Sequence, residues 1–151
     1  MYRNILIPTD GSSNSKRAAQ HALKIIDLQG NLIILHIIER YSIQPGVLPI
    51  STITSVDENL YDELEQEGKD ILKEIKEYLR EKYPEKYEKT NFTCEIREGK
   101  PDLEILKTME EEDVNLVVMG ASGRHGLDRV VLGSVTERVI RKSNRPTLII
   151  P

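Results

Sequence analysis

The sequence of 151 residues has a single cysteine, no tryptophan and one phenylalanine, and aromatic residues make up only 5% of it. The lone thiol of Cys94 excludes an internal disulfide and a cysteine-based metal cluster, and it suits the reducing cytosol. No apolar run approaches the roughly 20 residues that a membrane-spanning helix needs. The chain runs from Met1 straight into a strand pattern without a visible signal peptide. We therefore expect a cytoplasmic protein that does not contact a membrane.

The charge of the chain is mildly acidic overall but unevenly distributed. The formal net charge is −4, which argues against general binding of nucleic acid. Residues 120–145 nevertheless carry six basic and two acidic residues, a net +4, so the remainder carries −8. A positive island in an acidic chain suits a small polyanionic ligand.

The hydrophobic pattern alternates between strands and helices along a length that suits one domain over residues 1–151. Apolar runs without alternation predict strands that are buried on both faces, whereas residues 91–97 alternate and predict an edge strand. The predicted strands are 4–8, 32–38, 91–97, 114–119 and 147–150. Helices are predicted over 14–28, 57–83 and 134–142. Gly30 is expected to end the first of these and Pro84 the second. A further helix is predicted to begin near Pro101 and to bury Leu103, Ile105, Leu106 and Met109. Residues 39–56 are expected to form an irregular loop. This order predicts a three-layer, Rossmann-like α/β fold with a parallel sheet covered on both faces.

The stretch 120–136 follows a predicted buried strand and leads into a predicted helix. Its glycines are spaced as Gly120-x-x-Gly123, nine further residues, and Gly133-Ser134. Glycines let the backbone approach a ligand, and the free amides of a helix N-terminus bind anions. The spacing is neither that of a P-loop nor Gly-x-Gly-x-x-Gly. We interpret the stretch as a phosphate site, with Arg124 inside the loop as its most informative cation.

Two alternatives explain parts of this pattern without a ligand. Ser134 and Glu137 form a Ser-x-x-Glu capping box, which starts helices in many proteins, and Gly133 would then be only a turn. His36, within the second predicted strand, is interpreted as a histidine with one satisfied hydrogen bond and not as a catalytic or metal-binding residue.

Ligands of parallel sheets bind beyond the carboxyl ends of the strands, where the strand order reverses. Loops 9–13 and 120–126 would face one cleft if the first and fourth strands are neighbours.

Several segments together resemble the universal stress protein family over essentially the whole chain. They are Ile-Leu-Ile-Pro-Thr-Asp-Gly-Ser (5–12), Leu-His-Ile (35–37), Val-Val-Met-Gly (117–120), the glycine–serine motif, and Arg-Pro-Thr-Leu-Ile-Ile (145–150). The complete glycine–serine motif is similar to that of the ATP-binding branch. The resemblance implies an adenine nucleotide alpha hydrolase-like fold with strand order 3-2-1-4-5, in which the first and fourth strands are neighbours.

The resemblance also implies a role for each matching residue. Asp10 would approach the adenosine, Ile37 would read the adenine edge through its backbone, and Met119 would form a wall of the base pocket. The other implied contacts are Pro8 and Thr9 beside Asp10, Gly120, Ala121 and Ser122 at the ribose, Gly123 and Arg124 at the phosphates, and the amides and a hydroxyl of Gly133, Ser134, Val135 and Thr136 at the phosphate tail. The ligand would be ATP, ADP or AMP with a magnesium or manganese ion held mainly by the phosphates. Many relatives carry a histidine where this chain has Ser122, and we assign no role to His125.

The resemblance further implies a homodimer in which strands 147–150 pair across a two-fold axis. An unpaired apolar edge strand is a liability, although Pro146 and Pro151 would also blunt the edge of a monomer. The expected function is an ATP-dependent switch or stress-response regulator, whose loop 39–56 could present a surface to an unidentified protein partner. The alternatives are a weak ATPase or nucleotidyl-transferring enzyme and a structural dimer with an empty site. We assign no catalytic residue, because the sequence has no P-loop lysine and no second carboxylate near the glycine loop.

Overall fold

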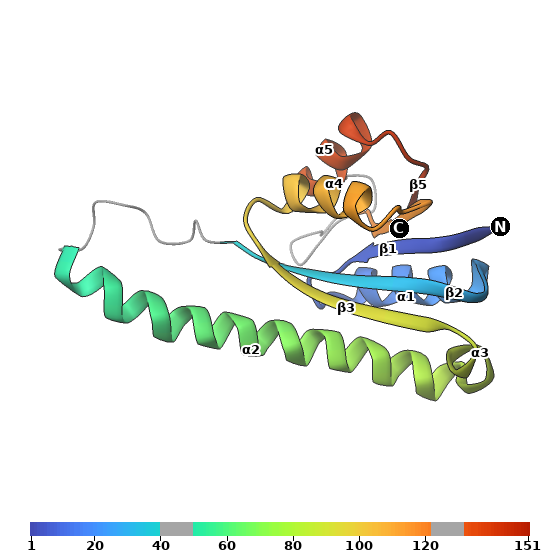
Figure 1. Cartoon of the computed structure of the whole chain (residues 1–151), viewed down its shortest axis with the longest axis horizontal. Coiled ribbons are helices and arrows are strands. Elements are labelled where there is room, and N and C mark those ends of the chain that lie inside the picture. Colours follow the sequence, from blue (N-terminus) through green and yellow to red (C-terminus); the bar gives the residue numbers. More distant parts are fainter. Residues whose placement is uncertain (40–49, 122–131) are drawn as a thin grey trace.

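The computed structural model describes residues 1–39, 50–121 and 132–151, and for residues 50–57 it describes the backbone alone. The elements follow one another as β1 (Tyr2–Pro8), α1 (Ser13–Ile25), β2 (Ile26–Ile38), α2 (Ile50–Lys82), α3 (Pro84–Glu88), β3 (Asn91–Glu98), α4 (Pro101–Glu111), β4 (Leu116–Gly120), α5 (Ser134–Lys142) and β5 (Thr147–Ile150). The described strands form one parallel sheet in the order β3-β2-β1-β4-β5. This confirms the predicted α/β class and strand order (Figure 1).

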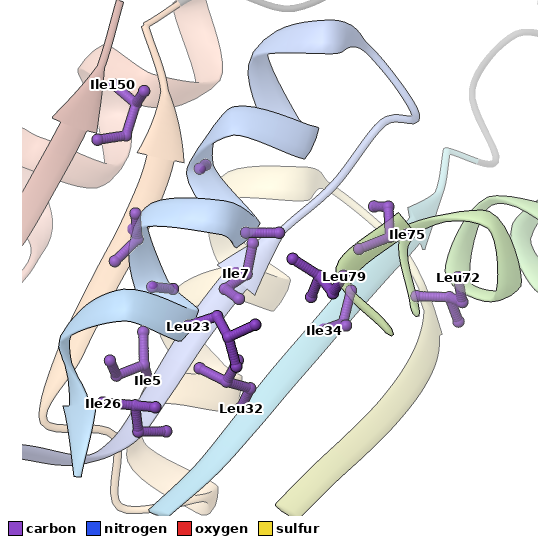
Figure 2. Close-up of a cluster of buried hydrophobic side chains, with 14 of the residues drawn as sticks. Ile5, Ile7, Leu23, Ile26, Leu32, Ile34, Leu72, Ile75, Leu79 and Ile150 are labelled. Carbon is purple, nitrogen blue, oxygen red and sulfur yellow. The ribbon is translucent and has the colours of Figure 1, made fainter. Parts of the chain in front are cut away.

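Each face of the sheet is covered by helices. Ile5 and Ile7 of β1 point into a cluster with α1 and α2, which Figure 2 shows from close by. Leu6, between them, packs on the opposite face with side chains of α4 and α5. Because successive strand residues point to opposite faces, both kinds of position must be apolar, which explains the absence of alternation in this strand. No helix in the described part of the chain is long and apolar enough to cross a bilayer.

The predicted end of the first helix is wrong. Helix α1 ends at Ile25, and Gly30 lies inside β2, where the register against β1 shifts between Tyr2 and Asn4. A Cβ atom at Gly30 would lie 2.9 Å from the Arg3 carbonyl oxygen. Gly30 is therefore needed for the close approach of two strands and does not end a helix.

Three further features of the helices differ from the sequence prediction. Helix α2 begins at Ile50, so residues 50–56 are helical, while residues 40–49 lie outside the described residues. Pro84 follows the end of α2, as predicted, but it also begins the short helix α3, because proline fits the first position of a helix. In α4, Leu103 is 48% exposed, whereas Asp102 is buried beside Arg138 and Lys142 of α5. Leu103 is thus exposed, contrary to prediction, whereas Ile105 and Met109 are buried as predicted.

Candidate functional site

The carboxyl ends of β1 and β4 lie next to each other in the sheet. β1 pairs with β4 on one side and with β2 on the other, so the strand order reverses at this point. The last residue of β4 also touches the first turn of α1: a Cβ atom at Gly120 would lie 2.8 Å from the Cβ atom of Asn14. The first and fourth strands are thus neighbours, as expected, and their carboxyl ends lie at the position where ligands of parallel sheets bind.

Thr9, the first residue after β1, is buried and hydrogen-bonded through each of its polar groups. Its amide donates to the Leu35 carbonyl at 2.8 Å, and its carbonyl lies 3.0 Å from Nδ1 of His36. Its hydroxyl donates to Oγ of Ser15 at 3.0 Å and accepts from the Gly11 amide at 3.2 Å. The histidine thus has the satisfied hydrogen bond expected of it, and Thr9 is fixed in position.

Asp10 is held by the turn that it begins. Its Oδ1 atom accepts from the Ser12 amide at 2.9 Å and from the Ser15 hydroxyl at 3.3 Å. Gly11 has φ +81°, a value that favours glycine. Ser12 then caps α1 by accepting from the Ser15 amide. The half-buried carboxylate is therefore fixed at the end of β1 before any ligand binds.

Ser15 is a site residue that the sequence interpretation missed. It is only 4% exposed, and its hydroxyl contacts both Thr9 and Asp10. The available signal was a second serine, three residues after the capping serine, in Thr-Asp-Gly-Ser-x-x-Ser. A serine in the first turn of a helix is common, so the pattern alone does not indicate that its hydroxyl is buried.

Both ends of the glycine stretch lie together at the end of β4. The Ala121 amide donates to the Ile150 carbonyl at 2.8 Å, and the Gly133 amide donates to the Ala121 carbonyl at 2.7 Å. The Thr136 hydroxyl donates to the Gly120 carbonyl at 3.0 Å. Residues 122–131 between these ends lie outside the described residues, and they include the predicted contacts Ser122, Gly123 and Arg124, as well as His125.

The N-terminus of α5 is not closed by a capping box. Gly133 is the N-cap, and among the described residues no side chain caps the helix. Ser134 is already the first helical residue, and Glu137 pairs instead with Arg141 at 2.9 Å. The first-turn amides, which lack partners inside any helix, therefore have no capping side chain here. The capping-box alternative does not describe this helix.

The remaining predicted residues lie on the α4/α5 side of the sheet. Met119 is buried in the cluster on that face, and Ile37 and Val135 pack against the same cluster. Pro8 ends β1 opposite Leu35, and it faces the same side as Leu6 because side chains alternate along a strand. The structure thus brings the described members of the predicted site to one end and one side of the sheet, while the Thr9 hydroxyl points toward α1.

A cavity of about 630 Å³ opens between the first turns of α4 and α5. This volume lies within the range of about 300–1,000 Å³ that is typical of small-molecule sites. Its lining includes Ser134 and Val135, the cations Lys100, Arg138 and Lys142, and the carboxylates Glu39 and Asp102. Lys142 lies 3.4 Å and Arg138 lies 3.9 Å from the buried Asp102 carboxylate. Within the described ranges, no three His, Cys, Asp or Glu residues form a group that could hold a metal ion.

Comparisons with known proteins agree with the resemblance in the sequence. The model of the universal stress protein family matches residues 1–151. Universal stress protein MJ0531 of Methanocaldococcus jannaschii is 34% identical over 152 residues, covering 99% of this chain and 82% of that protein. The solved structure of MJ0577 from the same organism is 32% identical, with a TM-score of 0.81 over 99% of this chain and 96% of the other.

A second similar structure contains a bound ligand. The universal stress protein from Archaeoglobus fulgidus in complex with dAMP aligns with a TM-score of 0.64, covering 99% of this chain and 98% of that one. The identity is 19%, so this likeness indicates the shared fold alone.

Proposed function

Because this chain belongs to the universal stress protein family, we propose that it binds an adenine nucleotide and acts as an ATP-dependent switch or regulator in a stress response. The observation that carries the proposal is the N-terminus of α5, which no side chain of the described residues caps, beside the end of β4 and next to a carboxylate fixed at the end of β1. The dAMP complex of a protein with the same fold supports the choice of an adenine nucleotide. ATP is the proposed ligand, with ADP or AMP as the alternatives.

The adenosine would lie at the ends of β1 and β2. Asp10 presents a fixed carboxylate there, and Pro8, Thr9 and Ile37 line the same edge, with Met119 beneath. A carboxylate accepts hydrogen bonds from hydroxyl groups such as those of a ribose. This end of the site needs no rearrangement of Asp10 or Thr9, because their hydrogen bonds are already formed.

The phosphates would lie at the start of α5. The amides of Ser134, Val135 and Thr136 and the exposed Ser134 hydroxyl are the proposed donors, with Gly133 allowing close approach. The predicted phosphate contacts Gly123 and Arg124 belong to the same proposal, whereas Gly120, Ala121 and Ser122 are proposed at the ribose. Arg138 and Lys142 add positive charge along the adjoining cavity. A magnesium or manganese ion would be held mainly by the phosphates, since hard divalent cations prefer oxygen ligands.

The proposed assembly is a homodimer through β5. Among the described strands, β5 lies at the edge of the sheet and pairs with β4 alone. Leu148 of β5 is 37% exposed, so the strand carries apolar surface that a second copy would cover. The unidentified protein partner and the cytoplasmic location remain predictions.

A weak ATPase or nucleotidyl-transferring enzyme is the alternative, and no described contact favours it. Oδ1 of Asp10 already accepts two hydrogen bonds that hold the turn, which suits a positioning role better than that of a general base. Steady release of phosphate over many turnovers by the protein alone would favour the enzyme.

The proposed function is tested by removing one amide from α5. Ser134→Pro deletes the amide and the hydroxyl of the first helical residue, whereas Ser134→Ala deletes the hydroxyl alone. Proline is tolerated at this position of a helix, α3 and α4 both begin with it, and Gly133 has the extended ψ of 153° that a residue before proline prefers. Both variants should therefore fold with melting temperatures near that of the unaltered protein.

We expect isothermal titration calorimetry to show that Ser134→Pro weakens Mg-ATP binding about tenfold, because a hydrogen bond to a charged group contributes roughly 1.5–3 kcal/mol. Ser134→Ala should stay within about threefold of the unaltered protein. Equal affinities for the proline and alanine variants would contradict the placement of the phosphates. An unaltered protein that neither copurifies with nucleotide nor is thermally stabilised by Mg-ATP would overturn the proposed function.

A further inference from the structure

We infer that His36 is a positioning residue of the nucleotide site, where its side chain takes the place of a backbone hydrogen bond between β2 and the end of β1. The inference rests on the proposed function, because it assigns a role in holding the adenosine end of that site. It concerns a residue that touches Thr9 and α2, and no contact between His36 and the nucleotide is required.

The hydrogen bonds of the parallel ladder define what His36 replaces. In such a ladder, alternate residues of a central strand turn their N–H and C=O groups toward opposite neighbours. The Leu35 carbonyl accepts from Thr9 on the β1 side, and the Ile38 carbonyl accepts from the Gly99 amide after β3. Ile37, two residues after Leu35, therefore turns its N–H and C=O toward the β1 side.

The paired register of β1 and β2 ends at Pro8 and Leu35, two residues before Ile37. A continued ladder would send the Ile37 amide to the Thr9 carbonyl. In the described part of the chain, that carbonyl has Nδ1 of His36 as its donor instead, at 3.0 Å. Because a carbonyl only accepts, Nδ1 carries the proton. The His36 side chain thus provides the hydrogen bond that the Thr9 carbonyl would otherwise accept from the Ile37 amide. The Ile37 amide then points toward the end of β1 without bonding to the Thr9 carbonyl.

The imidazole is fixed from its other edge by α2. A Cβ atom at Gly68 would lie 2.7 Å from Cδ2 of His36 and 3.2 Å from Cδ1 of Ile96. Only the absence of a side chain at Gly68 lets α2 approach this closely. The ring is therefore held between the Thr9 carbonyl on one edge and α2 on the other, and a change at Gly68 would be transmitted to Thr9 through the ring.

Two substitutions of nearly the same shape separate the hydrogen bond from the packing of the ring. His36→Asn places an amide N–H close to the position of Nδ1, whereas His36→Leu fills similar space without a donor. His21 supplies a matched control, because its Nδ1 also lies close to a backbone carbonyl, that of Arg17 at 2.9 Å, but on the exposed surface of α1. The probes are Mg-ATP, adenosine and inorganic tripolyphosphate, each measured by calorimetry.

We expect His36→Leu to weaken the binding of adenosine and Mg-ATP roughly tenfold, the loss expected when a buried carbonyl loses its donor. His36→Asn should restore the affinity to within about threefold of the unaltered protein. Tripolyphosphate should bind all variants equally, because it uses the α5 end of the site, and His21→Leu should change none of the three affinities. Gly68→Ala should repeat the loss for adenosine, and should add little to it in a His36→Ala background, where the ring is gone.

Two results would overturn the inference while leaving the proposed function intact. One is a His36→Leu protein that binds adenosine as tightly as the unaltered protein. The other is a parallel loss for adenosine and tripolyphosphate together with a lowered melting temperature, which would make His36 a residue of general stability. If the unaltered protein bound neither ATP nor adenosine, the proposed function would fail first and the inference with it.

Discussion

The two loops that meet at the carboxyl end of the sheet treat their polar groups in opposite ways. In the turn after β1, Thr9 and Asp10 are held by partners within the chain, chiefly Ser15, His36 and the Ser12 amide. At the start of α5, the first-turn amides have no capping side chain among the described residues. The polar groups of the first loop are thus satisfied within the chain, whereas no side chain of the described residues caps the amides of the second.

This difference suggests a division of labour in the proposed site. A region whose hydrogen bonds exist beforehand loses little conformational freedom when a ligand binds, so it contributes orientation. Unpaired amides at a helix N-terminus contribute attraction for an anion, which the helix dipole strengthens. The first region would therefore determine which nucleoside binds, and the second would supply most of the affinity for its phosphates. Three substitutions sharpen or break this comparison.

The largest effect is expected at Gly120, where the two regions touch. In Gly120→Ala the new methyl group would lie 2.8 Å from Cβ and 3.2 Å from the backbone carbonyl carbon of Asn14, so α1 and β4 must separate. Overpacking of this kind costs about 1–3 kcal/mol. We expect a lower melting temperature and a loss of affinity for adenosine and tripolyphosphate together, measured by calorimetry below the melting transition.

Gly30→Ala is the matched control for this substitution. It also brings a methyl group against the backbone, 2.9 Å from the Arg3 carbonyl oxygen, but near the start of β1, away from the site. It should lower the melting temperature by a similar amount and leave both affinities unchanged. If Gly30→Ala weakened nucleotide binding as much as Gly120→Ala, the effect would be one of stability and the proposed junction would have no special role.

The second substitution, Ser15→Ala, removes a hydrogen-bonding group from the turn after β1. It removes the buried hydroxyl that accepts from the Thr9 hydroxyl and contacts Asp10. The Gly11 and Ser12 amides still donate to Thr9 and Asp10, so the loss is that of an ordinary hydrogen bond, about 0.5–1.5 kcal/mol of unfolding free energy. We expect adenosine to bind several-fold more weakly while tripolyphosphate binds as before. Thr90→Ala is the control, because Thr90 is a buried residue like Ser15 and its hydroxyl donates to the backbone carbonyl of Lys86. A loss of tripolyphosphate binding in Ser15→Ala would refute the division between the two loops.

The comparison also explains which features could be predicted from the sequence. The class of the fold follows from the alternation of apolar runs, and Asp10 and the glycine–serine motif lie in contiguous segments that resemble the family. Ser15 and His36 are different, because the roles of their side chains depend on partners brought close by folding, and for His36 the partner is 27 residues away. A sequence pattern predicts that His36 has a hydrogen bond, but the identity of the acceptor requires the pairing of β1 with β2.

The same reason accounts for one of the predictions that were wrong. Gly30 carries a local signal that ends helices, yet its neighbour in space is the backbone of Arg3. Ser134 and Glu137 match a capping box, yet α5 is capped one residue earlier and Glu137 pairs with Arg141. Leu103 fits an apolar stripe, yet it is exposed, while Asp102 is buried beside α5. For Gly30 a contact between distant segments overrides a pattern that is common at helix ends, whereas the capping-box alternative at Ser134 fails within α5 itself, because Glu137 pairs with Arg141.

The smallest expected effect concerns the cations beside the open amides. Arg138 lines the cavity at the start of α5 and lies 3.9 Å from the buried Asp102 carboxylate, whereas Arg141, one turn further along, is paired with the exposed Glu137 through Nε and Nη2. Arg138→Gln and Arg141→Gln therefore remove the same charge from the same helix. Because Arg138 is largely exposed, its attraction for a phosphate is worth about 0.2–1 kcal/mol. Arg138→Gln should weaken Mg-ATP binding two- to fivefold at low ionic strength, and Arg141→Gln should not. The difference should shrink as salt shortens the screening length, which is about 10 Å at 0.1 M. Equal losses in both variants would mean that the phosphates respond to the net charge of α5 and not to a cation at its open end.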